Sequence, residues 1–229
     1  MEPTRPSARL DFTTLARPRR FAIAIAAAIA AGAFVWALNP GPRWQVAPRQ
    51  VAHGNVLIDD DPVPADDVAS LNDALMPGGT LEWNGDGELE LISHGQLALA
   101  ITPGTRMTLP PPPARWFDRR SAGRIDAGEI RLTSGPRFPG ATLTLDTPDA
   151  TLLITGTTLA VIQESHGTSV CVLEGSVRVR AGSGDAGRIA AGREVVLTKG
   201  RSGTPSEIRP IEKARLMEMR DAMRPFLED

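Results

Sequence analysis

The sequence contains no tyrosine, and aromatic residues make up only 4% of its 229 residues. Its single cysteine, Cys171, cannot form an internal disulfide, which excludes a disulfide scaffold and a cysteine-based zinc site. Lysine occurs only at Lys199 and Lys213, and the formal net charge is -2. A slightly acidic chain has no electrostatic reason to bind nucleic acid, so we expect no nucleic-acid partner.

Motifs of known catalytic sites are also missing, since no G-x-S-x-G, H-E-x-x-H or phosphate-loop pattern occurs. His53, His94 and His166 each precede a glycine, which is typical of solvated turns. The acidic stretch at residues 59–67 (DDDPVPADD) contains prolines and lacks the ligand spacing of a calcium loop, so we interpret it as a solvated loop. We expect no catalytic residue, no metal site and no cofactor. An enzyme with an unfamiliar site is the alternative from another class.

One long apolar segment is present at residues 21–38 (FAIAIAAAIAAGAFVWAL), which contain 18 residues without a charge. As a helix they extend roughly 27 Å, close to the thickness of a bilayer's hydrocarbon core. Arg17, Arg19 and Arg20 precede the segment, and the positive-inside rule therefore predicts a cytoplasmic N-terminus.

We accordingly expect a short cytoplasmic tail (1–20), one transmembrane helix (21–38) in the cytoplasmic membrane, and a main domain on the periplasmic, extracytoplasmic side. A cleaved signal peptide is the alternative, because the small residues Ala31-Gly32-Ala33 could form a cleavage site.

Residues 44–200 carry short runs in which apolar and polar residues alternate, as at Leu89/Leu91 and Val177/Val179, separated by glycine-rich turns. This period of two predicts strands with one face in a core. Within residues 147–162 the apolar positions are even-numbered before Gly156 and odd-numbered after it. A bend or bulge at Gly156 would let both halves face the same core.

In the C-terminal residues 207–229 the apolar residues recur at helical spacing instead of alternating, which predicts an amphipathic helix. Leu216, Met219 and Met223 recur at helical spacing, and we expect this stripe to pack against the sheet. Pro225 is expected to end the helix.

A set of spaced residues in the second half of the chain forms one motif: Thr147, Pro148, Gly156, Thr157, Glu174 and Gly175. This motif resembles that of the FecR domain, the periplasmic sensory module of iron-dicitrate-type transmembrane regulators. The resemblance covers about residues 46–200 and is most specific over residues 147–180.

This resemblance implies a mainly β fold: a solenoid- or sandwich-like antiparallel domain (44–200), with the N-terminal transmembrane helix and the C-terminal helix added. It also implies a non-enzymatic sensory or interaction module with an envelope protein as partner, which takes part in transmembrane signalling to an extracytoplasmic-function sigma factor. The sequence does not specify the oligomeric state. A structural or ligand-binding envelope module without sigma-factor regulation is the alternative.

We predict that residues 1–20 alone do not bind a sigma factor. They offer few apolar anchors (Leu10, Phe12 and Leu15), and a stable protein interface buries on the order of 1,200 Å² or more. A pull-down of this segment against the extracytoplasmic-function sigma factors of the host should recover none of them. Specific binding that Phe12→Ala or Leu15→Ala abolishes would contradict the prediction.

Overall fold

The computed structural model describes residues 42–48, 52–114, 119–182, 184–199 and 201–228. Contacts divide the chain into Met1–Pro40 and Gly41–Asp229, and the described residues all belong to the second unit. The expected cytoplasmic tail and the expected transmembrane helix at 21–38 lie outside them. Within the described ranges, no helix is both long enough and apolar enough to cross a membrane.

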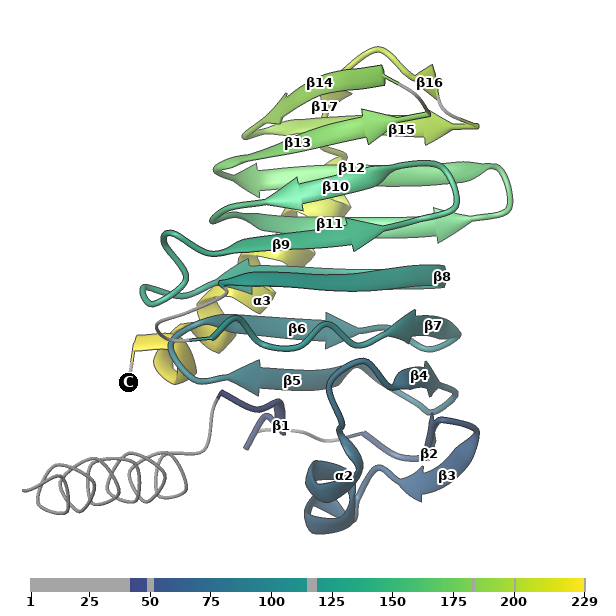
Figure 1. Cartoon of the computed structure of the whole chain (residues 1–229), viewed down its shortest axis with the longest axis vertical. Coiled ribbons are helices and arrows are strands. Elements are labelled where there is room, and N and C mark those ends of the chain that lie inside the picture. Colours follow the sequence, from purple (N-terminus) through teal and green to yellow (C-terminus); the bar gives the residue numbers. More distant parts are fainter. Residues whose placement is uncertain (1–41, 49–51, 115–118, 183, 200, 229) are drawn as a thin grey trace, which may run out of the picture. The chain divides into compact units, whose positions relative to one another are not determined.

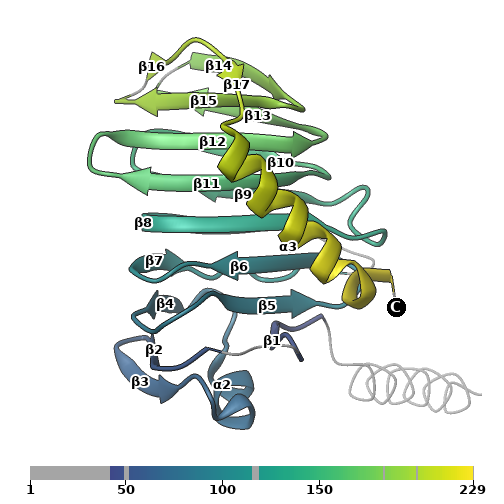
Figure 2. The same ribbon diagram turned by 180° about the vertical axis from the view of Figure 1, so that it is seen from behind.

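The second unit is mainly β, and its strands form a hydrogen-bonded network that folds into two layers (Figures 1 and 2). We call the layer beneath the C-terminal helix the helix-covered sheet, with strand order β1-β5-β6-β8-β11-β12-β15. Two short strands, β16 and β17, both pair with β15. The strands of this sheet are β1 (Gln45–Val46), β5 (Leu89–Ser93), β6 (Leu97–Ile101), β8 (Arg120–Ser134), β11 (Thr158–Glu164), β12 (Gly167–Glu174), β15 (Arg193–Thr198), β16 (Arg201–Ser202) and β17 (Ser206–Glu207).

The other layer, the open sheet, has the strand order β3-β2-β4-β7-β8-β9-β10-β13-β14. Its strands besides β8 are β2 (Asn55–Ile58), β3 (Asp61–Pro64), β4 (Thr80–Trp83), β7 (Thr105–Thr108), β9 (Thr142–Asp146), β10 (Thr151–Ile154), β13 (Ser176–Ala181) and β14 (Gly184–Ala190).

The long strand β8 belongs to both layers and joins them. Its first half pairs with β7 and β9 in the open sheet, and its second half pairs with β6 and β11 in the helix-covered sheet. The β8–β9 pairing is parallel, whereas the other described strand pairs are antiparallel. The antiparallel-dominated β fold therefore agrees with the expectation from sequence.

The main core lies between the two layers and explains the period of two in the sequence. Alternate residues of the helix-covered sheet, such as Leu99 and Val161, belong to one buried cluster with Leu145, Leu152 and Val177 of the open sheet. Burying such a side chain contributes roughly 1.5–3 kcal/mol, so each strand is fixed in register by its apolar face.

The helix α3 (Pro210–Glu228) crosses the outer face of the helix-covered sheet (Figure 2). Leu216 packs in a cluster with Ala160 and Cys171, and Met219 and Met223 pack over small residues of β6. The predicted packing of the Met stripe against the sheet is confirmed. Both faces of β5 and β6 are consequently buried, which their alternating sequences did not indicate.

Pro225 lies inside α3, and the prediction that it ends the helix is wrong. Proline removes one backbone donor and clashes with the preceding turn, which destabilises a helix interior. Here the residues after it bury apolar surface: Leu227 belongs to the cluster under α3, and Phe226 packs against that cluster. This burial near the last turn favours continuation of the helix.

The aspartates of the acidic stretch 59–67 are exposed as expected, but the stretch is not an irregular loop, because residues 61–64 form β3 and Ala65 is buried in the core. Asp59 Oδ1 accepts a hydrogen bond from the Thr80 N–H at 2.8 Å. Asp67 caps the helix α2 (Val68–Ala74), which the sequence analysis missed, and hydrogen bonds from Ser70 lower the pKa of its carboxyl.

The change of apolar parity at Gly156 marks the passage from one layer to the other. β10 ends at Ile154 in the open sheet, and β11 begins at Thr158 in the helix-covered sheet. Gly156 has φ +135°, a conformation that residues with a side chain rarely adopt. Residues on both sides of the bend, including Leu152 and Val161, face one core, as the parity predicted.

We predict that Gly175→Ala destabilises the protein more than Gly192→Ala does. The two glycines have nearly the same φ, +76° and +77°, so the backbone cost of about 1–2 kcal/mol is matched. A Cβ at position 175 would lie 2.4 Å from the Gly156 carbonyl oxygen, whereas one at 192 meets nothing within 4 Å. The additional crowding should cost about 1–3 kcal/mol, visible as a lower melting midpoint. Equal midpoints for the two variants would contradict this packing.

Candidate functional site

The motif residues Thr147 and Pro148 lie in the turn between β9 and β10. The Thr147 hydroxyl accepts a hydrogen bond from the Ala150 N–H at 3.0 Å and one from the Thr168 hydroxyl at 2.9 Å. Thr168 also donates to Asp149 Oδ2 at 3.1 Å, whereas Pro148 is exposed. These bonds hold the turn against β12.

The other four motif residues meet at a second place, where β10 passes to β11 and β12 turns into β13. Gly175 lies against the backbone of Gly156 and Thr157. Glu174 accepts a hydrogen bond from the Thr158 hydroxyl at 3.3 Å and forms an ion pair with Arg220 of α3. The Glu174–Arg220 ion pair therefore connects the segment where the chain passes from the open sheet to the helix-covered sheet with α3.

Charged residues are buried beneath α3. Arg131 pairs with both Glu88 and Glu129, and its side chain is 3% exposed. Burial raises the pKa of the Glu129 carboxyl, Arg131 lowers it, and the nearby Glu212 adds to the rise. The Glu129 side chain is 15% exposed and paired with Arg131, so it does not present a free carboxylate to solvent, whereas the Glu88 side chain is 38% exposed.

Cys171 is fully buried on the outer face of β12 beneath α3. Burial raises the pKa of its thiol to about 12, with Glu194 adding to the effect. A thiol in that state is almost entirely protonated at neutral pH and is a poor nucleophile. His94 bonds Gln45 Oε1 at 3.1 Å and His166 pairs with Glu164 at 3.2 Å, and both rings are exposed.

The outer face of the open sheet is the polar surface that α3 does not cover. Outward residues form rows across its strands. In one row, Arg180 lies opposite Thr151, Thr151 opposite Asp146, and Asp146 opposite Arg124. The Thr151 hydroxyl donates to Asp146 at 2.6 Å, and Arg124 Nε donates to Asp126 at 2.6 Å. The two arginines are therefore matched in number by Asp146 of this row and by Asp126, which lies beside Arg124 on β8.

The neighbouring row is not balanced. Arg178 of β13 lies directly opposite Arg188 of β14, and on its other side it faces Leu153 of β10. Among the side chains that the structure describes, no carboxylate forms an ion pair with either arginine. Like charges directly opposite each other destabilise an antiparallel pair.

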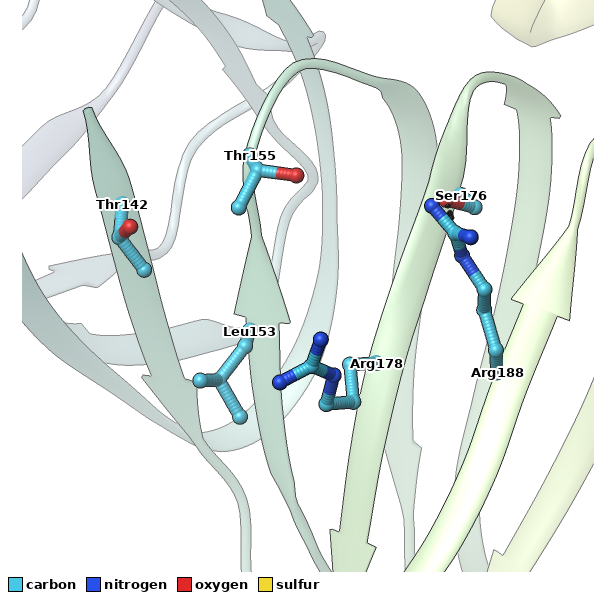
Figure 3. A pocket seen from close by; sticks show the side chains of 6 residues that line it. All are labelled: Thr142, Leu153, Thr155, Ser176, Arg178 and Arg188. Atoms are coloured by element: carbon cyan, nitrogen blue, oxygen red, sulfur yellow. Dashed lines mark hydrogen bonds between the residues drawn. The ribbon is translucent and has the colours of Figure 1, made fainter. Parts of the chain in front are cut away.

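A hollow of about 160 Å³ lies over this row (Figure 3). The Arg178 side chain extends beside Leu153, and Arg188 Nε donates a hydrogen bond to the Ser176 hydroxyl at 2.7 Å. The hollow is lined by Thr142, Leu153, Thr155, Ser176, Arg178 and Arg188. It combines two guanidinium groups with three hydroxyls, and this donor set is suited to an anion.

The sequence analysis did not identify this site. The alternation of Val177 and Val179 with Ser176, Arg178 and Arg180 already placed the arginines on an outward face. The pairing of β13 with β14, which brings Arg188 beside Arg178, depends on strand register and carries no local sequence signal.

The comparison with known proteins concerns the middle of the chain. Residues 88–178 match the family model described as FecR protein. Two crystal structures of a candidate anti-sigma factor from Parabacteroides distasonis ATCC 8503 are similar in fold, with a TM-score of 0.45 and 16% sequence identity. The similarity covers 56% of this chain and 59% of that one, so the chain spans less than two thirds of that protein. No curated protein matches the chain. The resemblance to the FecR family is thereby confirmed for residues 88–178.

Proposed function

We propose that the protein is a membrane-anchored, FecR-like sensory and interaction module of the cell envelope, which acts by binding another protein. The observation that carries the proposal is the FecR match over residues 88–178. These residues include β5 to β12 and the start of β13, so they contribute strands to both layers and the strand that joins them. The match therefore covers the scaffold on which the exposed surfaces are built.

The geometry supports binding rather than catalysis. Within the described ranges, no group of three or more His, Cys, Asp or Glu side chains is placed to hold a metal ion. Cys171 is buried beneath α3 with a raised pKa. The outer face of the open sheet presents a broad polar surface that α3 does not cover, and an extended surface of this kind can form a protein interface.

Membrane anchoring is part of the proposal and rests on the apolar residues 21–38 and the arginines before them. In this arrangement the β domain lies outside the cytoplasmic membrane and detects a partner there. The FecR resemblance points to an extracytoplasmic-function sigma factor as the final target of the signal. We infer that the signal reaches it through a separate membrane protein, because residues 1–20 offer few apolar anchors of their own.

The orientation can be tested in intact spheroplasts. Protease added outside should digest epitopes placed after residue 44 and leave an epitope in residues 1–20 protected. Permeabilised spheroplasts, in which both epitopes are digested, provide the control. Recovery of a soluble mature protein that begins near Phe34 would show that residues 21–38 are a cleaved signal peptide.

The regulatory role predicts a specific transcriptional response. Deletion of the gene should change the expression of one extracytoplasmic-function sigma regulon, and the full chain should restore it. A chain that lacks residues 44–229 should not restore it, because the partner-binding domain is missing. Unchanged sigma regulons after deletion would favour a structural or ligand-binding envelope module instead.

A further inference from the structure

We propose that the Arg178–Arg188 hollow is a binding site for a carboxylate side chain of the envelope protein partner. The inference rests on the proposed function, because it names the chemistry by which the open sheet recognises that partner. The carboxylate would lie between the two guanidinium groups, above Leu153 and beside the hydroxyls of Thr155 and Ser176.

The first argument is the unfavourable placement of the two arginines. Arg178 and Arg188 are direct cross-strand partners, and such a like-charge pair destabilises a sheet. Two other outward arginines on the same sheet have acidic partners: Arg106 lies 3.7 Å from Glu82, and Arg124 lies 2.6 Å from Asp126. An anion bound between Arg178 and Arg188 would replace their repulsion with two attractive pairs.

The second argument is the donor set. A guanidinium group presents parallel N–H donors that match the two oxygens of a carboxylate. Arg188 already donates one hydrogen bond to Ser176, which orients its side chain at the rim of the hollow. One exposed hydroxyl (Thr155), two half-buried hydroxyls and a half-buried leucine complete the lining, so a short acidic side chain finds donors for its oxygens and an apolar contact for its methylene groups.

The third argument is size. The hollow holds about 160 Å³, whereas pockets that enclose small molecules measure roughly 300–1,000 Å³. A free metabolite would remain largely in solvent here and would gain little from burial. A carboxylate presented by a folded or extended protein segment needs no enclosure, because the rest of its segment rests on the surrounding sheet surface.

The test uses the full-length protein in detergent micelles and a fluorescently labelled, N-acetylated hexaglutamate peptide, with binding measured by fluorescence anisotropy. The wild type should bind the peptide in a salt-dependent manner and should not bind a hexaglutamine peptide. The double variant Arg178→Gln, Arg188→Gln should bind hexaglutamate at least tenfold more weakly.

The matched control is the double variant Arg106→Gln, Arg124→Gln, which removes the same charge from the same face, and its binding should stay within twofold of wild type. Equal losses in the two double variants would overturn the proposal, since they would reveal general charge attraction. Displacement of the peptide by glutarate or inorganic phosphate as effectively as by unlabelled hexaglutamate would overturn the assignment to a protein partner.

The melting midpoint provides a second test. Substitution of the two arginines would lower the midpoint if their role were to stabilise the fold. Arg188→Glu places opposite charges across β13 and β14, so it should raise the melting midpoint while it abolishes peptide binding. A lower midpoint in both Arg188→Glu and Arg178→Gln would show that the arginines stabilise the fold, and would overturn the proposal. Peptide binding is measured independently of the sigma regulon. Loss of peptide binding with a persistent regulon response would contradict only the anion site, and peptide binding without a regulon response would contradict only the proposed function.

Discussion

The packing of α3 on the helix-covered sheet is the interaction on which the other surfaces of the domain depend. It buries Leu216, Met223 and Leu227 over small residues of β6, β11 and β12. Without that cover, the alanines and Cys171 on this outer face would be exposed as an apolar patch. Because the helix covers one outer face, the broad uncovered surface of the two-layer fold is the outer face of the open sheet.

Charged residues differ between the face that α3 covers and the face that it leaves open. Arg131 and Glu129 lie under the helix, where desolvation is expensive and each charge needs its partner. Arg178 and Arg188 lie exposed on the open sheet, where water and salt screen the repulsion between them. An arginine without an ion-pair partner therefore destabilises the fold less here than it would under the helix. The buried Arg131 is therefore paired within the chain, whereas Arg178 and Arg188 have no ion-pair partner among the described side chains and lie on an accessible surface.

The local sequence was sufficient to predict features that depend on near neighbours. Alternation at Val177 and Val179 identified strands, and the parity change at Gly156 located the passage between layers. It was insufficient where a distant segment decides the outcome. The alternation of Leu89 with Glu90 gave no sign that α3 would bury both faces of β5, and the contacts of Leu227 override the tendency of Pro225 to end a helix. The Arg178–Arg188 pair required the register of β13 with β14, which no single segment contains.

The path of α3 also has a mechanical consequence. The helix begins beside the last strands and runs back to β5, so that Leu227 near its end belongs to the same buried cluster as Ala47, next to β1 (Figure 2). The segment after β1 and the last turn of α3 therefore share one buried apolar cluster. Tension applied between residues 42 and 228 would load this apolar cluster together with the Trp44–Pro110 hydrogen bond and the pairing of β1 with β5.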